Sequence, residues 1–135
     1  MTENEFKSRT KQVALRVIRL VNTLPMSGVS GVIGKQLLRS GTSIGANYRA
    51  ACRGKSTAHV IHKLAIIEEE ADESLYWIEL LIESETVAAK KLASLTKEIG
   101  EILRMTGASI KTLRSKRQNL TTNSSNPKSK IQNPK

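Results

Sequence analysis

The sequence has few of the residues that mark several common protein classes. Its single cysteine, Cys52, excludes an intrachain disulfide. Aromatic residues make up only 3% of the chain, and alternating runs of β-branched and aromatic residues are missing, which argues against a β-sheet fold. The three prolines leave residues 26–126 without proline, which favours long helices. No apolar run approaches the roughly 18 residues that a membrane span needs.

Charge and the first residues suggest where the protein works and what it meets. Residues 1–5 are polar and acidic, unlike a signal peptide, so we expect a cytoplasmic protein with no membrane partner. The net charge is +10, yet residues 25–55 carry +5 and residues 56–84 carry −6. A basic surface indicates a polyanionic partner, RNA or DNA. Solubility, with neutralisation of the acidic segment by its neighbours, is the alternative meaning of the charge.

Apolar residues recur at helical spacing in four segments of a chain whose 135 residues suit one domain. We expect an all-α fold, an antiparallel up-down four-helix bundle over residues 1–117. A disordered basic tail is expected over residues 118–135, whose composition cannot bury a core. The expected helices cover about 3–24, 27–53, 56–84 and 86–114. Gly54 is expected to adopt a left-handed conformation after the second helix, and Ser56 is expected to cap the third.

The second segment has an unusual composition for a helix. One face of it carries Leu37, Ser40, Ile44, Asn47 and Ala51. Glycine inside a helix costs roughly 1 kcal/mol relative to alanine, so Gly41 and Gly45 need a packing reason. We expect another helix backbone to approach closely at the small residues around Gly41 and Ser43. The amide of Asn47 is expected to satisfy buried polar groups in the stripe.

Acidic residues of the third segment are expected to neutralise part of the second. The short connection around Lys55 makes the two segments pack antiparallel, which brings Arg39 within reach of Glu68 or Asp72. Trp77 lies beside the apolar stripe of the third segment and is expected to fill a groove between helices. A subunit contact is the alternative role for this tryptophan.

No catalytic constellation is present. His59 and His62 lie three residues apart, but no third metal ligand follows nearby at helical spacing. Glycine-rich phosphate loops and nucleophile motifs are missing, and Ser40 and Ser43 have no evident base. We therefore expect a protein that is not an enzyme and uses no metal or cofactor.

Basic residues of the first two segments form the expected nucleic-acid interface. Opposite its apolar stripe, the first segment carries a polar ridge of Arg9, Gln12, Arg16, Arg19 and Thr23. A solvated face is the commoner meaning of such a ridge. The residues expected to contact nucleic acid are Lys11, Arg16, Arg19, Lys35, Arg49, Arg53 and Lys55.

Two long motifs resemble a known bacterial family. Residues 39–47, which read Arg-Ser-Gly-Thr-Ser-Ile-Gly-Ala-Asn, are similar to the signature second helix of a four-helix-bundle family. That family was first noted in open reading frames of intervening sequences within 23S ribosomal RNA genes. Residues 48–53 and 68–83 resemble one common subtype, although His59 and Val60 stand where it often has Glu and Phe. The resemblance covers residues 6–114.

The resemblance implies a bundle that assembles into a closed ring of five identical subunits. A related branch serves diversity-generating retroelements as accessory proteins that bind nucleic acid and a reverse transcriptase. Most family members have no established function. We therefore expect a homopentamer that binds RNA or DNA through a basic surface, with a reverse transcriptase as the partner that the resemblance implies. A structural or adaptor oligomer that binds another protein is the alternative.

Overall fold

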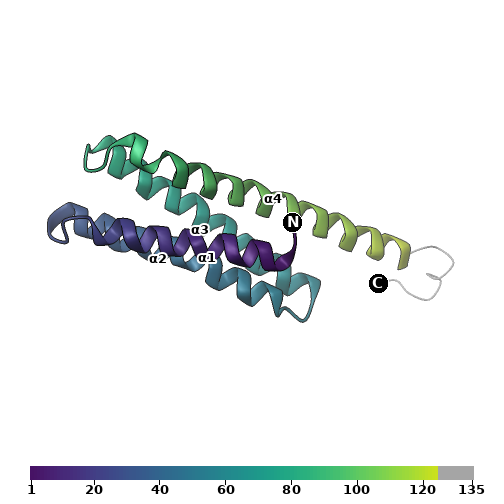
Figure 1. The fold of residues 1–135 in the computed structure, drawn as a ribbon. Coiled ribbons are helices and arrows are strands. Elements are labelled where there is room, and N and C mark those ends of the chain that lie inside the picture. Colours follow the sequence, from purple (N-terminus) through teal and green to yellow (C-terminus); the bar gives the residue numbers. More distant parts are fainter. Residues whose placement is uncertain (125–135) are drawn as a thin grey trace.

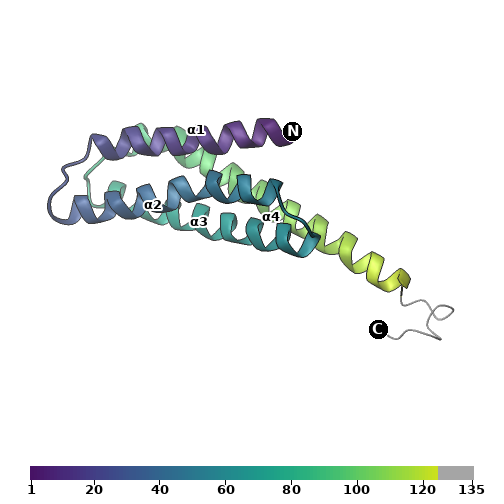
Figure 2. The same ribbon diagram turned by 90° about the horizontal axis from the view of Figure 1, so that it is seen from below.

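The computed structural model describes the backbone of residues 1–124 and the side chains of residues 1–120, and this part consists of four helices without a strand (Figure 1). The helices are α1 (Glu3–Asn22), α2 (Gly28–Cys52), α3 (Thr57–Glu83) and α4 (Ala89–Ser124). Each helix runs antiparallel to the one before it (Figures 1 and 2). The expected all-α, up-down four-helix fold is confirmed.

Local sequence signals set the first ends of two helices. Thr2 and Glu5 form a capping box, in which the Thr2 hydroxyl accepts from the Glu5 amide at 3.1 Å. The Glu5 carboxylate accepts in return from the Thr2 amide at 2.7 Å. Ser56 accepts from the His59 amide at 3.1 Å, so its expected role as N-cap of α3 is confirmed. Ser27 precedes α2 without a side-chain capping hydrogen bond.

The expected left-handed conformation at Gly54 is wrong. At the end of α2, the amides of residues 53 and 54 donate to carbonyls three residues earlier, at 3.1 and 2.9 Å. This tight, 3₁₀-like ending turns the chain without a left-handed residue. Within residues 1–124, positive φ angles occur instead at Gly28, with φ 68°, and at Glu85, with φ 61°.

Helix α4 begins later and ends later than the spacing of apolar residues predicts. It starts at Ala89 rather than at about residue 86. It continues to Ser124, past the expected boundary at residue 117, and projects beyond the end of the other three helices (Figures 1 and 2). Residues 115–124 contain neither glycine nor proline, so nothing in their sequence stops the helix. The rest of the expected tail, residues 125–135, lies outside the described residues.

The core is aliphatic, as the low aromatic content predicts. Its large, fully buried apolar side chains are Val13, Val17, Leu37, Ile44, Ile67, Ile78, Leu81, Ile99 and Ile102. Helix α2 packs extensively on α1 and α3, and α3 packs extensively on α4, whereas α1 and α4 make much less contact. The seam between α1 and α4 is therefore the least closed side of the bundle.

Candidate nucleic-acid interface

The glycines of α2 lie where α1 comes closest. A Cβ atom placed on the buried Gly41 would lie 2.9 Å from a methyl carbon of Val17. A Cβ atom on Gly45 would lie 3.3 Å from the Thr10 hydroxyl and 3.4 Å from the Thr10 carbonyl oxygen. The expected close approach of another helix is confirmed, and that helix is α1. A side chain at Gly41 would overlap with Val17, so something would have to shift there, whereas at Gly45 it would make a tight contact with Thr10.

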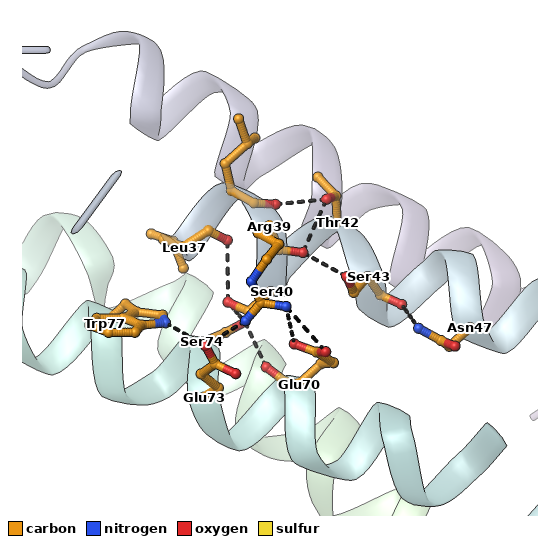
Figure 3. Close-up of polar contacts among 11 residues, drawn as sticks. Leu37, Arg39, Ser40, Thr42, Ser43, Asn47, Glu70, Glu73, Ser74 and Trp77 are labelled. Carbon is orange, nitrogen blue, oxygen red and sulfur yellow. Dashed lines mark hydrogen bonds and ion pairs between the residues drawn. The ribbon is translucent and has the colours of Figure 1, made fainter. Parts of the chain in front are cut away.

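A buried pair of serines joins α2 to α3 (Figure 3). The Ser74 hydroxyl oxygen lies 2.8 Å from both the Ser40 hydroxyl and the Glu70 carbonyl oxygen. Both serines are completely buried, so their hydrogen bonds offset the cost of removing the hydroxyls from water. The position of Ser40 in the helical stripe is predictable, but Ser74 as its partner depends on the register of α3.

Arg39 forms the expected ion pair between α2 and α3, but with other carboxylates. It donates to Glu70 at 3.2 Å and also to Glu73, and the hydrogen bond from Arg39 lowers the pKa of Glu73 (Figure 3). The expected partners point elsewhere. The Glu68 carboxylate lies 3.0 Å from the position that a Cβ on Gly107 of α4 would occupy. Asp72 is exposed. The register between α2 and α3 therefore differs by a fraction of a turn from the one expected.

Trp77 extends the Arg39 cluster, and Asn47 stays within its own helix. The half-buried Trp77 packs against the core, and its indole N–H donates to Glu73 of the same helix at 3.1 Å. This position beside the core agrees with the apolar stripe, and the choice between a groove and a subunit contact stays a prediction. Asn47 is only half-buried, and its amide donates to the Ser43 carbonyl at 2.9 Å. The expected full burial of Asn47 is thus wrong, and its amide satisfies a carbonyl of its own helix rather than groups of a neighbouring helix.

Arg9 does not belong to a solvated ridge on α1. Its guanidinium donates to both oxygens of Glu98, at 2.8 and 2.7 Å, and to Glu101 at 2.8 Å, which ties α1 to α4. These hydrogen bonds raise the pKa of Arg9, and the bond from Arg9 is the main cause that lowers the pKa of Glu98. Arg9 carries one positive charge and therefore balances only one of the two carboxylates of α4 in this cluster. Among the described side chains, no salt bridge joins a lysine of α4 to a carboxylate.

Two of the expected nucleic-acid contacts come together over the seam between α1 and α2. Lys11 of α1 and Arg49 of α2 line a hollow of about 670 Å³, which we call the Lys11 hollow. Its remaining lining residues are Lys7, Ser8, Thr10, Ala14, Thr42, Gly45 and Ala46. No carboxylate lines it within the described part of the chain. The Thr10 and Thr42 hydroxyls donate to carbonyls of their own helices, so the groups that suit a phosphate here are the cations beside small residues.

The other expected contacts are distributed over the surface. Arg16 and Arg19 line a separate hollow between the end of α1 and the start of α4. Lys35 is exposed on α2, and Arg53 and Lys55 are exposed at the turn between α2 and α3. None of these last three lines the Lys11 hollow.

Sequence reasoning missed a basic stripe along α4. Its members are Lys90, Lys97, Arg104 and Lys111, which are seven residues apart and all exposed. A spacing of seven residues is about two helical turns, so the four side chains share one face. The regular spacing is visible in the sequence and was the signal that could have found the stripe.

The remaining polar groups give no sign of an activated nucleophile. Tyr48 packs against Phe6 with ring centroids 4.7 Å apart, and burial raises its pKa to about 12. Burial also raises the pKa of the Cys52 thiol, which disfavours the reactive thiolate. His59 and His62 are exposed. Among residues 1–120, no three His, Cys, Asp or Glu side chains are grouped so that they could hold a metal ion.

No helix in the part of the chain that the structure describes combines the length and apolar character needed to cross a bilayer. This finding agrees with the lack of long apolar runs in the sequence.

Comparison with known proteins identifies the family. The family model described as 23S rRNA-intervening sequence protein matches residues 2–108. A crystal structure of a protein of unknown function from the S23 ribosomal protein family of Bacteroides thetaiotaomicron VPI-5482 is 37% identical, with a TM-score of 0.74. The match covers 82% of this chain and 99% of that one. No curated protein matches significantly. The chain therefore belongs to the family of 23S rRNA-intervening sequence proteins.

Proposed function

We propose that this protein is a non-enzymatic, cytoplasmic homo-oligomer, a ring of five subunits, that binds RNA or DNA through its basic surface. The observation that carries the proposal is the Lys11 hollow, which is lined by cations from two helices and by no carboxylate among the described residues. A phosphate group placed there would meet Lys11 and Arg49 together. The basic stripe of α4 supports the proposal, because its four exposed cations share one face and none of them forms a salt bridge with a carboxylate among the described side chains.

Binding of this kind follows from counterion release. Each phosphate neutralised by a lysine or arginine releases condensed cations, so affinity must fall steeply with salt. Little sequence preference is expected, because cations that contact phosphates position a nucleic acid without reading its bases. Assembly into a ring would repeat each weak patch and raise the overall affinity without any new contact.

The proposal is tested by fluorescence anisotropy with generic RNA and duplex DNA over a range of salt concentrations. Substituting Lys11→Gln together with Arg49→Gln should lower affinity and reduce the salt slope by about two per site. Arg114→Gln with Lys116→Gln removes one arginine and one lysine from exposed positions outside the hollow and outside the basic stripe, so it is the matched control. If both variants lost the same affinity, binding would depend on the total charge of the protein and not on the Lys11 hollow. Absence of binding at low salt, by folded and assembled protein, would reject a nucleic-acid function.

A further variant separates the bundle from the end of the chain. Deleting residues 125–135 removes three lysines and should weaken binding only modestly. If this deletion alone abolished binding, the bundle surface would be a solvated face and the Lys11 hollow would have no role.

An apolar patch at the start of α2 supports assembly. Met26, Val29 and Val32 are 55%, 74% and 62% exposed. Closed rings bury such surfaces between neighbouring subunits. Val29→Glu with Val32→Glu should reduce the mass measured by light scattering, whereas Gln12→Glu on the exposed surface of α1 should leave it unchanged. A monomeric wild-type mass at micromolar concentration would remove the oligomer from the proposal.

The same patch also favours the second candidate function, an adaptor that binds another protein. A reverse transcriptase would be one such partner if the resemblance to the retroelement branch holds. Patch variants that keep the wild-type mass but lose a protein partner would favour this adaptor function.

A further inference from the structure

A second hollow, at the seam between α1 and α4, differs from the Lys11 hollow in having an aliphatic floor. It measures about 600 Å³, within the range of roughly 300–1,000 Å³ typical of small-molecule sites. The end of α1, the α1–α2 connection, the α3–α4 connection and the start of α4 all contribute to it. We call it the Arg16 hollow. It lies on the least closed side of the bundle.

Three cations line the Arg16 hollow: Arg16, Arg19 and Lys91. The guanidinium of Arg16 is oriented by a hydrogen bond to the Ser94 hydroxyl at 2.9 Å, a neutral partner that leaves its charge in place. No ion pair joins Arg16 or Arg19 to a carboxylate among the described side chains. The hydrogen bond from Arg9 is the main cause that lowers the pKa of Glu98, and the charge of Arg16 adds a smaller effect. Both carboxylate oxygens of Glu98 accept hydrogen bonds from Arg9, and none from Arg16 is present among the described side chains.

The floor determines what kind of anion fits. Leu24, Leu92 and Leu95 are buried beneath the hollow, while Leu20 and Val87 are half-buried and keep accessible surface. No aromatic residue lines this hollow in the described part of the chain. A nucleobase would lack a stacking partner there, whereas an alkyl chain would replace water over aliphatic carbon.

We propose that the Arg16 hollow binds an organic anion with an aliphatic body, that is, a medium-chain carboxylate or an alkyl phosphate. The alkyl chain lies over Leu20 and Val87, and the anionic head lies between Arg16, Arg19 and Lys91. The preorganised Arg16 fork donates to the head in a charge-assisted hydrogen bond. This site is separate from the Lys11 hollow and does not depend on nucleic-acid binding.

The test uses the assembled wild-type protein and isothermal titration calorimetry with octanoate as the probe. Acetate supplies the head without the chain, and octanol supplies the chain without the charge. Octanoate should bind, and both partial ligands should bind at least about tenfold more weakly. Octyl phosphate is the second arm. Binding of octyl phosphate supports the site whether it is tighter or weaker than octanoate, and the order of the two affinities shows which anionic head the site prefers. Octanol that binds as well as octanoate, or no detectable heat with either anion, would overturn the proposal.

Three variants locate the binding. Arg16→Gln with Arg19→Gln should weaken octanoate by about tenfold or more, whereas Lys11→Gln with Arg49→Gln should leave it unchanged. Lys91→Gln alone gives a smaller loss at an exposed position, and it keeps the test valid if the double variant unfolds. If Lys11→Gln with Arg49→Gln weakened octanoate binding equally, net charge would explain the effect and the site would be refuted.

A chemical footprint provides an independent readout. Lys90 and Lys91 are adjacent and exposed, but only Lys91 lines the hollow. Octanoate should slow acetylation of Lys91, measured by mass spectrometry, and leave Lys90 unaffected. Equal rates for Lys91 with and without octanoate would contradict the proposed position of the head.

Discussion

Replacing Gly41 by alanine tests the contact between α1 and α2 most directly. The added methyl group would lie 2.9, 3.1 and 3.3 Å from three carbon atoms of Val17. Val17 is completely buried and β-branched, so it cannot swing away cheaply. Overpacking of this kind costs about 1–3 kcal/mol, and the better helix propensity of alanine returns roughly 1 kcal/mol. We expect a net loss of up to about 2 kcal/mol.

Gly100 of α4 provides the matched control. A methyl group there would have only the end of the Arg104 side chain within 4 Å, at an ordinary contact distance of 3.7 Å. Gly100→Ala should therefore stabilise the protein by about 1 kcal/mol through helix propensity. A second control removes the clash: in a Val17→Ala background, Gly41→Ala should become neutral or stabilising, which gives a large coupling energy in a double-mutant cycle.

The assay is urea unfolding followed by circular dichroism, at one fixed protein concentration because assembly would make stability depend on concentration. If Gly41→Ala were as stable as wild type while Gly100→Ala gained stability as expected, α1 and α2 would not be this close. The proposed reason for the glycine-rich composition of α2 would then fail.

Three further changes follow from specific contacts. Glu85 lies at φ 61°, and its amide and the next one donate back to α3 as in a Schellman ending. Because glycine adopts this left-handed conformation without strain, Glu85→Gly should raise the free energy of unfolding in urea by about 0.5–1 kcal/mol. A loss of stability would contradict the left-handed conformation at Glu85. Arg9 lowers the pKa of Glu98 in the folded protein. Their pair therefore stabilises the fold fully above the pKa that Glu98 has in the unfolded chain, and the effect is lost as pH falls through the lowered pKa of the folded protein. Between pH 7 and pH 3, the free energy of unfolding should fall by less in Arg9→Met than in the wild type. An equal fall in both proteins would refute the pairing. Asn47→Leu should change stability by less than about 1 kcal/mol, because Asn47 is half-buried and bonded within its own helix; a larger loss in melting experiments would restore the buried role.

Much of the fold could be predicted because it depends on signals within single helices. Apolar periodicity located the four helices, and the Ser56 cap could be predicted from residue type alone. The end of α4 could not, because a polar composition does not by itself stop a helix that has no glycine or proline. The absence of a left-handed Gly54 shows the same limit, since a tight 3₁₀-like ending satisfied the last carbonyls instead.

Contacts between helices were predictable in kind but not in partner. Small residues in α2 indicated a close neighbour, and the structure shows that this neighbour is α1. The charge of Arg39 indicated an acidic partner on α3, yet Glu70 and Glu73 fill that role instead of Glu68 and Asp72. A displacement of two residues turns a helix through more than half a circle, so even a small error in register selects different side chains.

The contrast between Arg9 and Arg16 shows what decides the role of a surface cation. The two are seven residues apart and face the same neighbour, so the sequence of α1 treats them alike. Because α4 runs antiparallel, Arg9 meets Glu98 and Glu101, whereas Arg16 meets only the hydroxyl of Ser94. The first cation ties α1 to α4, and the second forms no ion pair among the described side chains and lines a hollow with an aliphatic floor. The capacity to bind an anion is therefore set by the residue opposite on α4, and Ser94→Glu should remove it from the Arg16 hollow while leaving the Lys11 hollow unchanged.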